Sequence, residues 1–158
     1  PSASGTALGG GGNIARHNEL SGAPHMAVGV SGNDHVFEYN VVSNVCMSSD
    51  DASAFYKGRN PSCRGNILRY NFWSEIGSPR GHGNAAVYFD DGDGGDFVVG
   101  NVFYRCGEPG FGGFGTVFCH GGYSNVVRNC LFVDCERPLG PPPAPRGSSP
   151  RPGRAASS

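Results

Sequence analysis

The sequence lacks a charge imbalance, a long apolar run and the cysteine spacing of a zinc site. Lys and Arg number 12 against 13 Asp and Glu, so the formal net charge is −1. A charge this close to zero gives no indication of nucleic acid or a membrane surface as a partner. No run approaches the length of a transmembrane helix, and no Cys-x-x-Cys or Cys/His cluster of zinc type occurs. At 158 residues the chain is one domain at most.

A self-similar segment runs through the chain. It reads Asn-Ile-Leu-Arg-Tyr-Asn-Phe-Trp-Ser-Glu-Ile from Asn66 to Ile76, and further copies begin at Asn13, His35, Asp96 and Asn125. No helical period fits these copies, and their spacing of about thirty residues is typical of solenoids. Each solenoid unit stacks on the last because it cannot bury its apolar face alone.

The superposed copies share columns of like residues, and their alternation with polar residues is that of strands with one buried face. A buried amide needs hydrogen-bond partners, which stacked coils supply as a ladder with a step of about 4.8 Å. The apolar columns hold Ala15, Phe37, Leu68, Val98 and Val127, then Leu20, Val42, Trp73, Phe103 and Phe132, then Val45, Ile76, Cys106 and Cys135; the amide column holds Asn18, Asn40, Asn71 and Asn101, with Cys130 in fifth place.

A second set of strands separates the copies, over Ala27–Val30, Ala54–Lys57, Ala86–Phe89 and Thr116–Cys119. This order predicts an all-β fold: a right-handed, single-stranded parallel β-helix of about four to five coils with an Asn ladder. We predict that residues 1–12 end a preceding coil, that 13–137 form the β-helix, and that the Pro/Arg/Ser-rich residues 138–158 are a disordered tail. Because an uncapped solenoid exposes strand edges, we also expect the chain to be a fragment of a longer protein.

Six cysteines allow either a disulfide framework or buried thiols. The repeat favours thiols, because Cys106 and Cys135 share an inward column and buried cysteine behaves as a small apolar residue. Cys46 and Cys63, in loops on either side of Asp50 and Asp51, are the first pair to test for a bridge.

Alternation in the second strand set places aromatic side chains on the outer face. Asp90 and His120 share this outward side, in the column of Gly58. Aromatic rings stack against sugars and carboxylates bind their hydroxyls, so the row is a candidate sugar-binding surface. A ladder that only stabilises the coil is the alternative. The inward residues are Val28, Phe55, Val87 and Val117, and the outward ones are Gly29, Tyr56, Tyr88 and Phe118.

Two carboxylate pairs, Asp50 with Asp51 and Asp90 with Asp91, are candidate catalytic groups. Glycoside hydrolysis uses one carboxyl as acid and a second as base or nucleophile, and close like charges raise one of the two pKa values. Asp51 precedes its strand and Asp90 closes the next, and five strand residues span about 16 Å. Glycosidase carboxyls are about 5 to 9.5 Å apart. The pairing therefore requires the 46–53 loop to fold back, and Asp90 with His120 is the closer pair.

Other readings of the same region remain open. Asp91, Asp93 and Asp96 offer oxygen ligands for Ca²⁺, although the EF-hand spacing is absent and a plain Asp/Gly turn is the alternative. Lys57, Arg59 and Arg64 raise the possibility of a polysaccharide lyase, which needs a base and a cation. Alternation puts Lys57 on the inward side, which disfavours that role. His25 is a candidate base or a turn residue, whereas His17 and His35 belong to the repeat and are interpreted as structural.

Several motifs together resemble right-handed parallel β-helix carbohydrate-active proteins of the glycoside hydrolase family 141 type. They are Asp50–Arg59 with Arg64–Asn71, Val87–Gly92, Gly100–Tyr104, and His120-Gly121-Gly122 with Asn125. The resemblance covers Asn13 to about Leu139 and implies α-L-fucosidase or xylanase activity, with one catalytic aspartate in each pair. The sequence departs from the family pattern at Ser53, Lys57 and Cys130.

The sequence therefore predicts part of a secreted or periplasmic glycoside hydrolase that acts on plant or algal polysaccharide, without a required cofactor. Asp50/Asp51 and Asp90/Asp91 are its candidate catalytic groups, and Tyr56, Arg59, Tyr88 and His120 its candidate substrate-binding residues. A non-catalytic carbohydrate-binding or adhesin segment is the alternative, and a lyase is third. The rest of the same β-helix is the other expected partner.

Overall fold

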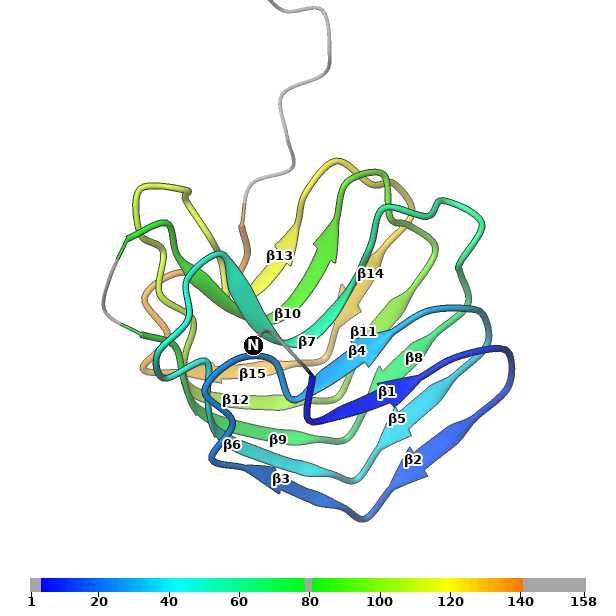
Figure 1. Ribbon diagram of the computed structural model, residues 1–158, viewed down its shortest axis with the longest axis horizontal. Coiled ribbons are helices and arrows are strands. Elements are labelled where there is room, and N and C mark those ends of the chain that lie inside the picture. The colour runs from blue at the N-terminus through cyan, green and yellow to red at the C-terminus, as the bar shows by residue number, and fades with distance from the viewer. Residues whose placement is uncertain (1–3, 79–80, 141–158) are drawn as a thin grey trace, which may run out of the picture.

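The computed structural model describes residues 4–78 and 81–140, and these form a parallel β-helix with three sheets (Figure 1). Each sheet has five strands, and every strand pairs in parallel with its equivalent in the next coil. The first sheet holds β1 (Thr6–Leu8), β4 (Val28–Val30), β7 (Ala52–Gly58), β10 (Asn84–Asp90) and β13 (Val117–Cys119). The second holds β2 (Ile14–Arg16), β5 (Val36–Glu38), β8 (Ile67–Arg69), β11 (Phe97–Val99) and β14 (Val126–Arg128). The third holds β3 (Glu19–Ser21), β6 (Val41–Val45), β9 (Phe72–Ile76), β12 (Val102–Cys106) and β15 (Leu131–Val133).

The predicted all-β, right-handed parallel β-helix is confirmed, together with its register. Phe55 pairs with Val28 and Val87, and Val87 pairs with Val117, as the inward column requires. These side chains are at most 1% exposed, and they form one continuous core with the apolar columns of the other two sheets. The described residues form no helix of the length and apolarity that a membrane span requires.

Each coil has three strands rather than the two that we expected. The repeated segment bends at its Asn, so that one strand of the second sheet ends before it and one of the third sheet begins after it. The residue before the Asn has a positive φ of 55° in His17, 53° in Tyr39 and 58° in Tyr70. Such a left-handed conformation turns the chain sharply, and non-glycine residues adopt it uncommonly. The Asn ladder thus follows a corner of the coil.

The predicted Asn ladder is confirmed. The side-chain amide of Asn18 donates to Asn40 Oδ1 at 2.9 Å, Asn40 donates to Asn71 at 3.0 Å, and Asn71 donates to Asn101 at 2.9 Å. The backbone amide of each donor also bonds to the same oxygen. In the fifth coil Cys130 Sγ contacts Val98 O at 3.6 Å, which replaces the amide with a weaker donor.

A second polar ladder, which was not predicted from the sequence, follows the corner between the first and second sheets. The backbone amide of Asn13 donates to His35 Nδ1, that of His35 to Asn66 Oδ1, that of Asn66 to Asp96 Oδ1 and that of Asp96 to Asn125 Oδ1, at 2.8 to 3.1 Å. His35 is 2% exposed and forms one step of this ladder, which confirms its structural role.

All six cysteines are free in the structure. Cys46, Cys63 and Cys106 are buried, and Cys119, Cys130 and Cys135 are half-buried. Burial raises the pKa of the Cys46 thiol to about 12, so this group stays neutral. The cysteines therefore fill space as small apolar residues.

Pairing with β13 continues beyond residue 137. Val117 donates to Pro138 O at 3.1 Å and accepts from the Gly140 amide at 3.0 Å, and Leu139 forms a parallel bridge with Val117. The first residues of the predicted tail therefore lie along the first sheet. The disorder predicted for residues 141–158 lies outside the described residues.

Candidate functional site

Six of the predicted site residues contribute to one polar cluster on the outer face of the first sheet. We call Tyr56, Arg59, Tyr88, Asp90, Asp91 and His120 the outer cluster. Its centre is the Asp90 carboxylate, which accepts hydrogen bonds from Tyr56 Oη at 2.7 Å, Tyr88 Oη at 2.9 Å and Arg59 Nε at 3.0 Å. The Asp91 amide donates to it at 2.8 Å, and His120 Nδ1 lies 3.2 Å away. The cluster thus joins residues of β7 and β10 with residues that follow β7, β10 and β13.

Strand register brings these residues together. Tyr56 pairs with Tyr88, and Asp90 pairs with Gly58, so that successive coils present equivalent positions side by side. A Cβ on Gly58 would lie 2.4 Å from the Asp90 Cβ. Gly58 therefore supplies the space that the Asp90 side chain occupies.

Hydrogen bonds hold Asp90 in its ionised form. Burial acts to raise the pKa of this carboxyl, but the bonds from Tyr56, the Asp91 amide, His120 and Tyr88 outweigh burial and lower the pKa to about 2. Burial and the bond to Asp90 raise the pKa of Tyr56 to about 12, and the same causes raise that of Tyr88 further. Both tyrosines are therefore neutral donors to a permanent anion at neutral pH.

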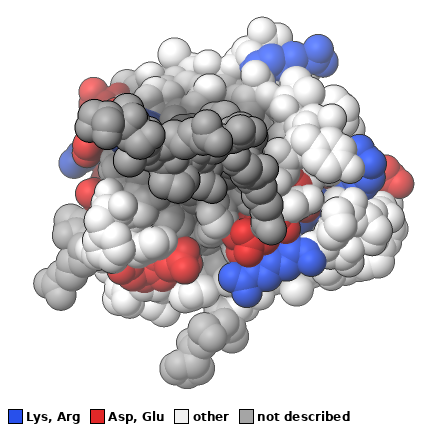
Figure 2. Space-filling model, turned by 90° about the horizontal axis from the view of Figure 1, so that it is seen from above, with Lys and Arg blue, Asp and Glu red and all other residues white. Residues whose placement is uncertain are grey.

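Three members of the outer cluster are accessible to a ligand. The side chain of Arg59 is 71% exposed, that of Asp91 54% and that of His120 47%. His120 Nδ1 lies 3.2 Å from the Asp91 carboxylate as well as from Asp90. Seen from above in Figure 2, acidic and basic side chains meet at the surface among uncharged ones.

The aromatic row faces outward as expected, but its rings are not an open platform. Tyr88 and Phe118 are each 5% exposed, and with Ala85 and Phe114 they form a separate apolar cluster. The Phe114 ring stacks on Phe118 with the centroids 4.3 Å apart and meets Tyr88 edge-on at 5.1 Å. Phe114 belongs to the loop between β12 and β13, which covers the row. Tyr56 is half-buried and is the more accessible of the two tyrosines.

The other two predicted catalytic residues lie at the opposite end of the strands. Ala52 pairs with Asn84 and Gly58 with Asp90, so Asp51 and Asp90 are separated by about 23 Å of strand at 3.3 Å per residue. Figure 1 shows that β7 and β10 bend so that both of their ends rise. The charge of Asp51 contributes, after burial and Asp90, to the raised pKa of both tyrosines.

Asp50 supports a loop rather than the outer cluster. Its carboxylate accepts hydrogen bonds from the backbone amides of His82 at 2.7 Å and Gly83 at 2.8 Å. These bonds, that of Gly83 first, lower the pKa of Asp50. In each predicted pair one carboxylate, that of Asp50 or Asp90, accepts hydrogen bonds that fix a neighbouring segment or side chain. Asp51 and Asp91 are exposed, as is Asp50, and only Asp90 is buried.

Lys57, Asp93 and Asp96 lie inside the coil, and we call them the inner cluster. The Lys57 ammonium is 1% exposed, contacts Asp93 Oδ1, and lies 2.6 Å from both Asp96 Oδ2 and Cys63 O. The inward direction predicted for Lys57 is confirmed, so it is not available as a base on the outer face. Asp91 is exposed on the outside while Asp93 and Asp96 are buried on Lys57. The carboxylate oxygens suggested as Ca²⁺ ligands thus lie on opposite sides of the coil wall, that of Asp91 outside and those of Asp93 and Asp96 inside.

Sequence reasoning missed Phe114, Gly58 and the inner cluster as a unit. Gly58 carried a usable signal, because glycine in an outward strand column marks a close approach of a neighbour. Phe114 carried none, since its loop has no counterpart of similar length in other coils.

No protein-family model, curated protein or solved structure matches this chain.

Proposed function

We propose that the outer face of the first sheet binds and hydrolyses an oligosaccharide segment of a plant or algal polysaccharide, as in the glycoside hydrolase family 141 type that the motifs resemble. The observation that carries the proposal is the outer cluster, where an exposed carboxylate, imidazole and guanidinium are fixed around one buried anion. Polar groups held by their neighbours suit recognition of sugar hydroxyls. The fold supplies rigid strands beneath them.

The exposed aspartates take the catalytic roles in this proposal. Asp91 transfers a proton to or from the reacting oxygen, and Asp51 is the second carboxyl on the far side of the face. Asp90 remains ionised and orients His120 and Tyr56, because its pKa of about 2 excludes a role as general acid at neutral pH. Arg59 and His120 bind sugar hydroxyls.

The test is hydrolysis of a panel of fucosylated glycans, xylans and algal polysaccharides, followed by the appearance of new reducing ends. Asp91→Asn is expected to lower turnover by about a hundredfold or more, the usual contribution of a general acid or base. Asp134→Asn is the matched control, since Asp134 is exposed beyond β15, outside the outer cluster. Unchanged turnover in Asp91→Asn, or no hydrolysis of any glycan, contradicts the proposed catalysis.

One observation favours a second candidate, a carbohydrate-binding module without catalysis. Asp90, which contacts both His120 and Arg59, already accepts hydrogen bonds from Tyr56, Tyr88 and Arg59, and Asp51 is distant along the strand. Glycan binding that persists in the Asp51→Asn/Asp91→Asn double variant, without release of reducing ends, supports this candidate over the hydrolase.

A further inference from the structure

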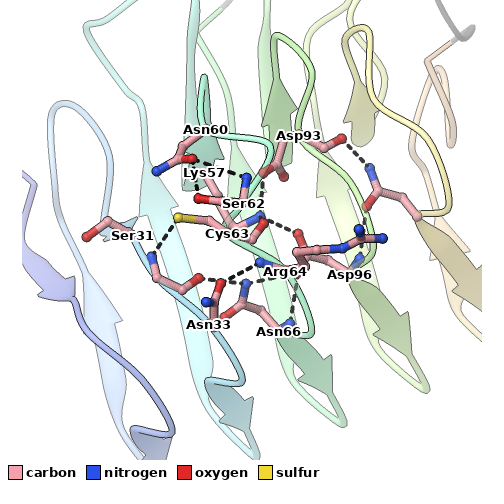
Figure 3. A network of polar contacts seen from close by, with 12 residues as sticks. Ser31, Asn33, Lys57, Asn60, Ser62, Cys63, Arg64, Asn66, Asp93 and Asp96 are labelled. Carbon is pink, nitrogen blue, oxygen red and sulfur yellow. Dashed lines mark hydrogen bonds and ion pairs between the residues drawn. The ribbon is translucent and has the colours of Figure 1, made fainter.

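The inner cluster places an amine against two carboxyl groups in the interior. The inward column in which Lys57 lies holds Leu8, Val30, Phe89 and Cys119 in the other coils, so a charged residue is exceptional there. Lys57 reaches Asp93 and Asp96 from the preceding coil (Figure 3). The three side chains are 0 to 1% exposed. A primary amine and two carboxyls are thus in contact where water is excluded.

The charges of this cluster do not balance if both carboxyls are ionised. One ammonium then faces two carboxylates, and an excess buried charge is costly. Burial raises the pKa of Asp93 to about 7 despite the Lys57 ammonium, and the charge of Asp96 acts in the same direction. Asp93 Oδ2 has no hydrogen-bond partner among the described residues. Asp96 is held more firmly, since its Oδ1 accepts from the backbone and side-chain amides of Asn66 at 2.8 and 2.9 Å.

We propose that Lys57 Nζ and Asp93 Cγ condense to an isopeptide bond, with Asp96 as the group that accepts and returns the protons. The reaction starts from the Lys57 ammonium, protonated Asp93 and ionised Asp96. Asp96 takes a proton from the ammonium, and the free amine attacks Cγ of Asp93. The C–O bond then breaks and water leaves. Of the protons involved, one stays on the amide nitrogen, two leave in the water, and the last remains on Asp96.

Contact geometry and burial both favour this condensation. Reacting groups that are held together gain the rate advantage of an intramolecular reaction. The reverse reaction needs water, which the interior excludes. The product also removes the charge of the amine and of Asp96, so that no ion remains in the interior. The bond joins residues 36 positions apart and links the end of β7 to the turn after β10 in the next coil.

The intact mass of the folded full chain tests the proposal. The expected mass is lower than that of the sequence by one water. A tryptic digest should yield a branched peptide that joins the Lys57 segment to the Asp93 segment, with no cleavage after Lys57. Lys57→Arg keeps the positive charge without a primary amine, and should retain the full mass. Asp96→Asn removes the proton acceptor, and should leave most molecules unlinked.

A second reaction also loses water, because Asp91-Gly92 and Asp93-Gly94 are able to form cyclic imides. The peptide map separates the two, since a cyclic imide leaves Lys57 cleavable and persists in Lys57→Arg. A folded wild-type chain of full mass overturns the proposal, and so does a water loss without the branched peptide.

Discussion

Asp90 and Asp93 lie three residues apart in one turn, yet their environments are opposite. Asp90 is on the outer face, and hydrogen bonds from tyrosines, a backbone amide and His120 lower its pKa to about 2. Asp93 is inside the coil, where burial raises its pKa to about 7. Both side chains are almost inaccessible to solvent. The difference shows that the supply of donors, rather than burial itself, decides whether a buried carboxyl is ionised.

The cations that face these carboxylates also differ, in their exposure to solvent. Arg59 is mostly exposed, so water screens its charge. Its ion pair with Asp90 therefore contributes little to the free energy of folding. Lys57 is the only cation of the inner cluster and is buried, so its loss leaves two carboxyls without a partner. The outer cluster is therefore suited to exchange contacts with a ligand, while the inner cluster holds neighbouring coils together.

The largest expected effect is that of Lys57→Met. Removal of one partner from a buried ion pair costs about 3–5 kcal/mol, because an uncompensated charge stays in the interior. Lys57→Met also removes the amine that the proposed isopeptide bond requires, so a loss is expected whether the wild type is linked or not. Urea unfolding followed by circular dichroism measures this change in the free energy of unfolding. Arg59→Met is the matched variant in the outer cluster, and its unfolding midpoint should barely move. Equal losses in the two variants would mean that the clusters do not differ in this way.

Stability should depend on pH in opposite directions for the two carboxyls. Asp90 has a lower pKa in the folded than in the unfolded chain, so its contribution is present above the ordinary aspartate pKa of 3.8 and is lost as pH falls toward about 2. At 1.36 kcal/mol for each pKa unit, the loss is about 2 kcal/mol. Asp90→Asn should abolish this acid-side loss, whereas Asp91→Asn should retain it. Unfolding curves between these pH values measure the difference.

Asp93 has a raised pKa in the folded chain, so its contribution is complete below 3.8 and is lost as pH rises through about 7. Asp93→Asn should remove this dependence of the free energy of unfolding on pH between 3.8 and about 7. A chain in which Lys57 and Asp93 are covalently joined has no free Asp93 to titrate, so the wild type should then be flat as well. Lys57→Arg, which cannot form the bond, should recover the slope. If the free energy of unfolding falls equally steeply with pH in the wild type and in Asp93→Asn, the pH dependence does not come from Asp93.

A smaller effect is expected for Gly58→Ala. The added Cβ would lie 2.4 Å from the Asp90 Cβ and 2.8 Å from its Cα, so Asp90 must shift. Overpacking of this kind typically costs about 1–3 kcal/mol, and glycan binding at the outer cluster should weaken with it. Gly29→Ala is the control in the same outward face, where the nearest atom is Ser4 Oγ at 3.3 Å. Equal tolerance of both substitutions would show that Asp90 does not depend on this space.

The repeat allowed the fold to be predicted because its columns record burial directly. Asn40, Asn71 and Asn101 recur at one position, and a buried amide at each coil must find its hydrogen-bond partners in the coils above and below. The second ladder was missed because His35 and Asp96 replace Asn in two of its steps. The three-stranded coil was missed because Tyr39 and Tyr70 form the corners, and neither residue type indicates a positive φ.

The site was predictable where strands position it and not where loops do. Alternation placed Tyr56, Tyr88 and Asp90 on one face, and the structure joins them by hydrogen bonds. Asp93 and Asp96 lie in the connection between β10 and β11, where alternation does not apply, so their inward direction had no sequence signal. The cover over the aromatic row likewise depends on the path of an irregular loop that carries Phe114.

The corner between the second and third sheets has one fixed length in every coil. His17-Asn18, Tyr39-Asn40, Tyr70-Asn71, Gly100-Asn101 and Asn129-Cys130 each connect one strand to the next. The longer and more variable connections instead flank the first sheet, at both ends of β7, β10 and β13. Insertions and deletions are thereby confined to the connections at the rim of the first sheet. Segments there are exchangeable without a change in the strand register between coils. A new specificity is accordingly best engineered by grafting loops at that rim.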